Sequence, residues 1–254
     1  MTMASPAPST PPAPSSSAAP SSSPSSATAS VPASSAPADS LGDWRTGPRV
    51  EGVDVSAYQP RVDWPGLWAE GLRFVWIKAS EGRTWRSPVF AAQRSGARAV
   101  GMLQGAYHYA RPASSSGAEQ ARHFVASGGG WTPDGTTLPG ALDLERNESG
   151  DPCFGHSPAG LAEWIRDFSE TYRQLTGRAP MIYVRADMWD QCLGGDRSFG
   201  ATNPLWLYDH DGEVGPWPAG WERPLVWQRG VVDGLDRNVW FGTLDQLHRL
   251  ARGV

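Results

Sequence analysis

The sequence predicts an α/β fold, an irregular TIM-like β/α barrel of eight strands with fewer helices in its C-terminal part. Short apolar runs alternate with amphipathic stretches, and Gly, Pro or Asp separates them at the expected strand ends. Eight such runs suggest a closed barrel. The final three runs have no long amphipathic stretch between them, so we expect antiparallel or loop-linked strands there.

The elements follow one another in a regular order. The apolar runs predicted as strands are bounded by turn-forming residues, and they lie at residues 52–55, 74–78, 101–109, 140–145, 181–184, 205–208, 225–228 and 237–240. The amphipathic stretches predicted as helices lie at residues 65–71, 88–99, 118–126 and 158–175. The last is the clearest helix, because Ser157 can cap it, Pro158 suits its first position and Gly177 can end it.

The N-terminal segment differs from the rest in composition. Up to about residue 40 it is almost entirely Ala, Pro, Ser and Thr, with no charge before Asp39. Such a segment cannot bury enough apolar surface to offset its ordering entropy, so we interpret residues 1–46 as a disordered linker. Upstream sequence translated from a misassigned start codon is the alternative. In either case we expect the function to lie in residues 47–254, which have the size of one barrel domain.

Charge and hydropathy exclude several classes of partner. The formal net charge is -4 and no run of Lys or Arg occurs, which argues against a nucleic-acid partner because such proteins use a clustered basic face. No apolar run reaches the length of a membrane span, and the N-terminus lacks the basic start and apolar centre of a signal peptide. Because Pro/Ser linkers are often found on wall-associated bacterial proteins, we expect an extracellular or wall-associated monomer.

The sequence contains two cysteines, Cys153 and Cys192. In an exported protein the pair would form a disulfide, and the alternative is two buried thiols that never meet. The absence of a C-x-x-C motif and of a Cys/His cluster argues against redox catalysis and structural zinc. Asp209-His210-Asp211-Gly212 is superficially similar to a calcium loop but lacks the remaining ligand spacing. We expect no cofactor and no metal.

The predicted strand at residues 140–145 carries two acids. Residues two apart on a strand point to the same face, so Asp143 and Glu145 project together while Leu142 and Leu144 face the other layer. Neighbouring like charges and burial both raise a carboxyl pKa, so we expect one of the two to stay protonated. A protonated acid is what cleavage of a glycosidic bond needs. A solvent-exposed acidic strand end would have the same pattern, so the pair alone does not establish catalysis.

Two further acids lie at predicted strand ends. Asp54 follows Gly52-Val53 in the first strand, and Asp236 directly precedes the last strand. Strand ends converge on the mouth of a barrel, where such folds carry out their chemistry. We therefore expect four acids in one bowl. The sequence does not give the carboxyl separation, which decides between direct attack and water activation.

Eight short motifs occur in an order that is typical of one family. They are Gly52-Val53-Asp54-Val55-Ser56, Ile77-Lys78-Ala79-Ser80-Glu81-Gly82, Gly105-Ala106-Tyr107-His108-Tyr109-Ala110, Leu142-Asp143-Leu144-Glu145, Pro180-Met181-Ile182-Tyr183, Pro204-Leu205-Trp206, Trp227-Gln228 and Asp236-Arg237-Asn238-Val239. On these motifs the chain resembles the family-25 glycoside hydrolases, the Chalaropsis-type lysozymes or N-acetylmuramidases. The resemblance implies an irregular β/α barrel and hydrolysis of the β-1,4 bond from N-acetylmuramic acid to N-acetylglucosamine in bacterial peptidoglycan.

The resemblance also implies roles for the acids. Glu145 would be the general acid, with Asp143 beside it and Asp54 and Asp236 as the other acids of the site. Two mechanisms remain open: the 2-acetamido group of the substrate attacks the anomeric carbon while Asp143 orients and stabilises it, or an aspartate attacks directly. The Asp/Glu pair at i and i+2 is similar to that of chitinases that use substrate assistance, and this analogy favours the first.

Residues at other strand ends are candidate substrate contacts. Lys78, the only lysine, lies near Glu81 and could hold a neighbouring carboxylate ionised, although a surface lysine would look the same. Aromatic faces can stack on sugar rings and phenols can hydrogen-bond a glycan, and the candidates are Tyr107, Tyr109, Tyr183, Trp206 and Trp227, with Gln228 as a hydrogen-bonding neighbour. His108 alternates with two of these tyrosines, so we expect it to face the outer layer as a structural residue.

Two departures from the family pattern lie at the predicted rim. Arg229-Gly230 stands where Tyr and then Thr or Ser is expected, and residues 207–212 are more acidic than expected. These departures leave open which glycan or peptide stem the protein prefers, but they do not affect the expected reaction type. A hydrolase of another acetamido-glycan such as chitin, and a non-catalytic wall-binding relative, are the alternatives. A serine hydrolase is disfavoured because no G-x-S-x-G motif occurs.

Overall fold

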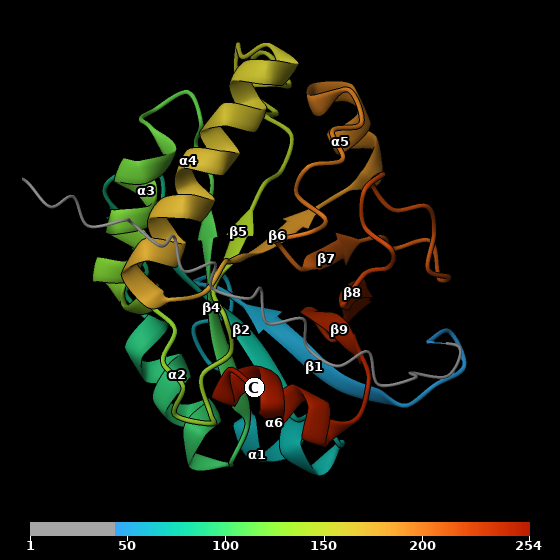
Figure 1. Ribbon diagram of the computed structural model, residues 1–254. Coiled ribbons are helices and arrows are strands. Elements are labelled where there is room, and N and C mark those ends of the chain that lie inside the picture. Colours follow the sequence, from blue (N-terminus) through green and yellow to red (C-terminus); the bar gives the residue numbers. More distant parts are fainter. Residues whose placement is uncertain (1–43) are drawn as a thin grey trace, which may run out of the picture. The chain divides into compact units, whose positions relative to one another are not determined.

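All eight runs predicted as strands form strands. In the computed structural model, which describes residues 44–254, they make one mixed sheet that closes into a barrel because the first strand pairs with the second (Figure 1). The barrel strands are β1 (Arg49–Val55), β2 (Phe74–Glu81), β4 (Leu103–Tyr109), β5 (Ala141–Asp143), β6 (Met181–Val184), β7 (Leu205–Tyr208), β8 (Val226–Val232) and β9 (Leu235–Phe241). A two-residue strand, β3 (Trp85–Arg86), pairs with the end of β2.

Strand direction changes only at the end of the chain. The barrel strands from β1 to β8 are all parallel to one another, whereas β9 is antiparallel to its two neighbours, β8 and β1. The hairpin between β8 and β9 turns at Asp233 and Gly234, which both have left-handed backbone conformations with φ of 52° and 76°. The expected antiparallel pairing near the C-terminus is therefore confirmed, and it belongs to one strand.

The four predicted helices are present on the side of β2, β4 and β5, or beneath the barrel (Figure 1). They are α1 (Trp64–Ala69), α2 (Phe90–Ala99), α3 (Gly117–Phe124) and α4 (Pro158–Thr176), and the π-helical turn η1 (Val125–Gly129) continues α3. The hydroxyl of Ser157 caps α4 by accepting from the backbone N–H of Gly160, and Gly177 ends it at φ 82°. None of the helices within residues 44–254 is long and apolar enough to cross a membrane.

Two helices were not predicted, α5 (Ala186–Leu193) and α6 (Leu244–Arg252). The signal for α6 was present in the sequence, because Thr243 and Gln246 form a capping box at its start. Its residues Leu247 and Ala251 are buried against the cluster of side chains inside the barrel. The helix therefore closes the end of the barrel opposite to the mouth, and the other end is left for a ligand.

The predicted linker, residues 1–46, lies mostly outside the described residues. Residues 44–46 form a turn, and the ring of Trp44 packs edge-on against Trp217 and Phe241, with centroids 5.5 and 5.0 Å apart. Trp44, which the prediction assigned to the linker, therefore packs against the domain.

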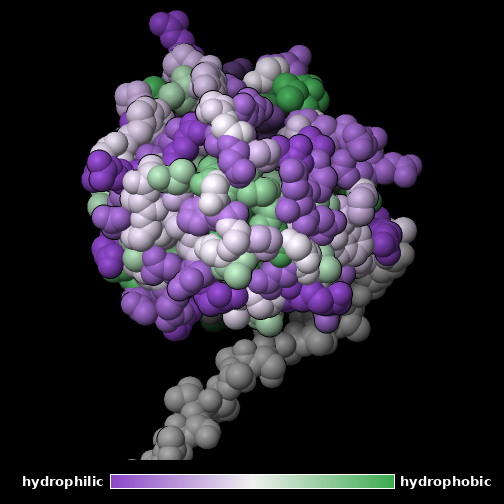
Figure 2. Space-filling model, turned by 90° about the horizontal axis from the view of Figure 1, so that it is seen from above, coloured by the Kyte–Doolittle hydropathy of each residue, from purple (hydrophilic) through white to green (hydrophobic). Residues whose placement is uncertain are grey.

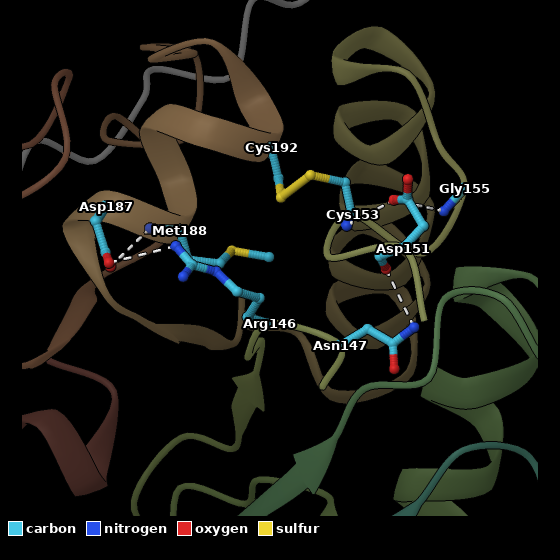
Figure 3. The surroundings of a disulfide bond; sticks show 8 residues. All are labelled: Arg146, Asn147, Asp151, Cys153, Gly155, Asp187, Met188 and Cys192. Atoms are coloured by element: carbon cyan, nitrogen blue, oxygen red, sulfur yellow. Dashed lines mark hydrogen bonds and ion pairs between the residues drawn. A yellow bond between two sulfur atoms is a disulfide. The ribbon is translucent and has the colours of Figure 1, made fainter. Parts of the chain in front are cut away.

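The predicted disulfide between Cys153 and Cys192 is confirmed (Figure 3). Cys153 lies in the loop between β5 and α4, and Cys192 lies near the end of α5. The carboxylate of Asp151 accepts hydrogen bonds from the backbone N–H groups of Cys153 and Gly155 at 2.8 and 3.1 Å. The loop that follows β5 is thus held both by its own turn and by a covalent link to α5.

Replacing both cysteines by serine is expected to lower the free energy of unfolding by about 4 kcal/mol. The bond closes a loop with a sequence separation of 39 and so restricts the unfolded chain. Urea denaturation measures the change, and intact mass should show a gain of two hydrogens when the wild type is reduced. The double-serine variant is the control, because its urea midpoint should not respond to reductant. A wild-type midpoint that is equally insensitive would contradict a stabilising disulfide.

Candidate active site

An open cavity of about 430 Å³ lies at the mouth of the barrel, where the parallel strands end. Its lining includes Asp54 on β1, Asp143 on β5, Glu145 just beyond β5 and Asp236 on β9. The four predicted acids therefore lie in one cavity. Asp236 stands at the start of its strand, yet it reaches the mouth because β9 is antiparallel and pairs it with Asp54.

Most of the predicted substrate contacts line the same cavity. They are Lys78, Tyr107, Tyr109, Tyr183, Trp206 and Gln228. Trp227 does not, because it precedes Gln228 on β8 and so points to the opposite face of the sheet. There it packs with Val239 and Phe241, and its indole N–H donates to the carbonyl of Asp209 at 2.7 Å. Seen from above, the surface of the protein is mostly hydrophilic, with a smaller area of more hydrophobic residues near its centre (Figure 2).

Asp54 is buried at the base of the cavity and is held by two amides. One of its oxygens accepts hydrogen bonds from the side chains of Asn238 at 2.7 Å and Gln228 at 2.8 Å. Burial and then the charge of Asp236 raise the pKa of Asp54 to about 7, although the two hydrogen bonds act in the opposite direction. Asp54 therefore changes its charge near neutral pH.

The raised pKa of Asp54 predicts a pH-dependent stability. The folded-state pKa of Asp54, about 7, exceeds the ordinary value of 3.8. The contribution of protonated Asp54 to the stability of the fold is therefore fully present below pH 3.8 and is lost as the pH rises through 7. We expect Asp54→Asn to make unfolding less dependent on pH and to stabilise the protein at pH 8 by a few kcal/mol relative to wild type. Urea denaturation at pH 4 and pH 8 measures this difference.

A matched control is Asp211→Asn, since Asp211 is exposed beside the barrel mouth. Its pH dependence of stability should equal that of the wild type. If Asp54→Asn destabilised the protein equally at both pH values, its carboxyl group would instead be ionised and stabilising across that range.

Asp143 and Glu145 face the cavity together, as the strand alternation predicted. Leu142 and Leu144 point away from it into the core between barrel and helices. The backbone N–H of Leu144 still bonds to the carbonyl of Tyr183 at 3.0 Å, so the chain remains extended past the end of β5. This extension keeps Glu145 on the same face as Asp143.

The two carboxyl groups differ in exposure. Asp143 is 5% exposed, and its Oδ1 is buried without a hydrogen-bond partner among residues 44–254. Glu145 keeps solvent-exposed surface at the cavity wall, and its Oε2 accepts from the hydroxyl of Tyr109 at 3.4 Å. Burial and the charge of Glu145 raise the pKa of Asp143 well above its ordinary value, and desolvation raises the pKa of Glu145 as well. Such a pair titrates jointly and retains a proton to higher pH than two isolated carboxyls.

Lys78 does not bond either of these acids directly. Its ammonium group pairs with Glu81 at 2.7 Å and lies over the ring of Tyr109 at 4.4 Å from the centroid. Arg111 pairs with the other oxygen of Glu81, also at 2.7 Å. The positive charge of Lys78 nevertheless lowers the pKa of both Asp143 and Glu145, so the predicted electrostatic role acts across the cavity rather than through an ion pair.

His108 lies outside the site, as predicted. It is fully buried, and its ring nitrogens bond to the hydroxyl of Ser80 at 2.8 Å and to Gln120 at 2.9 Å. Burial lowers the pKa of His108 to about 4, so the imidazole is neutral at neutral pH. Tyr107 and Tyr109 point the other way, into the cavity.

Sequence reasoning missed several residues of the cavity. The lining also contains Ser56, Tyr58, Gln59, Glu81, Arg111, Tyr208 and His210. Asn238, which donates to Asp54, was not predicted as a site residue, although an amide between Arg237 and the apolar Val239-Trp240 is a signal for a buried hydrogen bond. Its Oδ1 accepts from the indole of Trp206 at 2.7 Å, so Trp206 positions Asn238 from the floor of the cavity.

The sequence matches one family profile, described as Glycosyl hydrolases family 25, over residues 53–230. The chain is 42% identical over 210 residues to the N,O-diacetylmuramidase of Chalaropsis sp, a match that covers 80% of this chain and 100% of that protein. It is 38% identical over 226 residues to Lysozyme M1 of Streptomyces globisporus, covering 86% of this chain and 74% of that protein.

A solved structure shares the fold. The muramidase from Trichobolus zukalii superposes with a TM-score of 0.79 at 44% sequence identity, over 81% of this chain and all of that one (100%).

Proposed function

The chain belongs to glycosyl hydrolase family 25 and is a muramidase of the lysozyme type that cleaves peptidoglycan, and we propose that Glu145 is its general acid. The observation that carries this role is the pair of Asp143 and Glu145 on one face, in a cavity that also holds Asp54 and Asp236. The catalytic domain in this proposal is residues 47–254. Its substrate is the β-1,4 bond between N-acetylmuramic acid and N-acetylglucosamine.

Glu145 is suited to give a proton to the leaving oxygen. Desolvation raises its pKa, so the carboxyl remains protonated at a pH where an ordinary glutamate would be ionised. When the bond between the anomeric carbon and the glycosidic oxygen breaks, that oxygen takes the proton of Glu145. The resulting carboxylate can then accept a proton from the water that attacks the anomeric carbon in the second step.

Asp143 is suited to assist the 2-acetamido group of the muramic acid residue. In this route the acetamido carbonyl oxygen bonds to the anomeric carbon as the leaving group departs, and the acetamido N–H becomes more acidic. The buried Oδ1 of Asp143, which lacks a protein partner among residues 44–254, is an acceptor available to that N–H. This observation favours substrate assistance over direct attack by an aspartate.

The remaining residues of the cavity hold the sugar and the acids in place. We assign glycan contacts to the aromatic and polar residues that line it, namely Lys78, Tyr107, Tyr109, Tyr183, Trp206 and Gln228. Trp227 lies on the opposite face of β8 and is given no glycan contact. An extracellular or wall-associated location and a monomeric state complete the proposal, and the disulfide supports the location because such bonds persist in oxidising environments.

Product analysis tests the substrate. Peptidoglycan and chitin are digested separately, the new reducing ends are reduced with borohydride, and the sugar alcohols are identified. We expect muramitol from peptidoglycan and little or no product from chitin. Reducing ends from chitin, with none at muramic acid, would instead assign a hydrolase of another acetamido-glycan.

A further inference from the structure

A second cavity of about 260 Å³ adjoins the catalytic one. The two share Glu145, Tyr183 and Tyr208 as a common wall. The rest of the second cavity is lined by Leu144, Arg146, Glu148, Arg185 and Met188. A substituent of a sugar bound beside Glu145 therefore lies close to the second cavity.

The two sides of this cavity come from different elements that are tied together. Arg146 and Glu148 belong to the loop after β5, whereas Arg185 and Met188 belong to the start of α5. The disulfide links this loop to α5, and Arg146 pairs with Asp187 at 3.3 Å across the gap (Figure 3). The cavity thus has walls that are held before any ligand binds, and such preorganisation favours binding.

The lining combines an apolar floor with charges of both signs at the rim. Leu144 and Met188 are 0% and 1% exposed, so they form the floor. Arg185 lies over the ring of Tyr208 at 5.0 Å and pairs with Asp187 at 3.0 Å. The two arginines and Asp187 are about half exposed, and such ion pairs are weak enough to be shared with a ligand.

We propose that this second cavity binds the peptide stem attached to the muramic acid residue, an inference that rests on the proposed function. Muramic acid carries its peptide on a lactyl ether, and a peptide stem offers small apolar side chains, carboxylates and an amine. The methyl groups fit the floor of Leu144 and Met188. A guanidinium has five N–H donors, so Arg146 and Arg185 can bind a stem carboxylate in addition to Asp187, while Glu148 can take the amine.

The test compares two glycans that differ only in the stem. Soluble peptidoglycan strands are used either with their peptides or after removal of the peptides by an amidase. Wild type should have a lower KM for the peptide-bearing strands. Arg146→Gln and Arg185→Gln should each raise that KM roughly tenfold, which is the loss of one charge-assisted hydrogen bond, with kcat and the KM for stripped strands unchanged.

Arg166→Gln is the matched control. Arg166 is as exposed as Arg185 and also pairs with an aspartate, but it lies on α4 away from both cavities. It should behave as wild type on both glycans. An equal loss on both glycans for Arg146→Gln or Arg185→Gln, or no loss at all, would overturn stem binding. Failure of the wild type to cleave either glycan would contradict the muramidase function instead.

Discussion

Glu145→Gln is expected to lower hydrolysis of peptidoglycan by about three orders of magnitude while leaving binding to the glycan intact. Glutamine has the shape of glutamate but no proton to give to the leaving oxygen, and general acid catalysis contributes roughly 10²–10⁴-fold. The side chain lies at the cavity wall with exposed surface and one long bond to Tyr109, so the fold does not depend on its charge. Release of reducing ends measures the rate, and sedimentation with insoluble peptidoglycan measures binding.

Glu163→Gln is the control for this result. Glu163 is an exposed carboxylate on α4 that lines neither cavity, and it receives the same chemical change. Wild-type rates are expected for that variant on peptidoglycan. If Glu145→Gln retained near-wild-type lysis, Glu145 would not be the proton donor. A non-catalytic wall-binding protein would also show no dependence on this residue, because binding does not need an acid.

The barrel could be predicted because each strand is a short apolar run that ends in a turn. The helices α5 and α6 were not recognised, although their lengths of eight and nine residues are similar to that of α3, which was predicted. Their tertiary role is clear only in the structure, where α6 closes the lower end of the barrel and α5 anchors Cys192. Local pattern therefore predicted every barrel strand within residues 44–254 but left out two of the helices there.

The candidate site was predictable where strand alternation decides the direction of a side chain. Asp143 and Glu145 on one face, and His108 opposite to its tyrosine neighbours, follow from a period of two. Trp227 and Gln228 are neighbours on one strand, so their side chains point to opposite faces and only one of them can reach the cavity. In the structure that residue is Gln228. The loop residue Tyr58, which is 91% exposed at the rim, has no periodic context that could have identified it.

Asp143→Asn is expected to reduce kcat by about two to three orders of magnitude, because an amide cannot compensate the positive charge that develops on the reacting sugar. Stability should not suffer. The pKa of Asp143 is raised well above its ordinary value by burial, so its ionised form destabilises the folded state as the pH rises, and an uncharged asparagine removes that cost. Loss of activity together with equal or higher stability at pH 8 is the expected combination. A variant that lost both would identify Asp143 as a structural residue.

A second variant of Asp143 distinguishes direct attack by the aspartate from attack by the acetamido group of the substrate. If Asp143 attacked the anomeric carbon, Asp143→Ala with added azide should regain activity and yield a glycosyl azide, since the small anion can take the place of the missing carboxylate. If the acetamido group of the substrate attacks, azide should restore little, because the nucleophile was never removed. The Oδ1 of Asp143, which has no hydrogen-bond partner within the described part of the chain, favours the second result because it offers an acceptor for the acetamido N–H. We therefore expect no azide rescue at Asp143, and a glycosyl azide would assign the attack to its carboxylate.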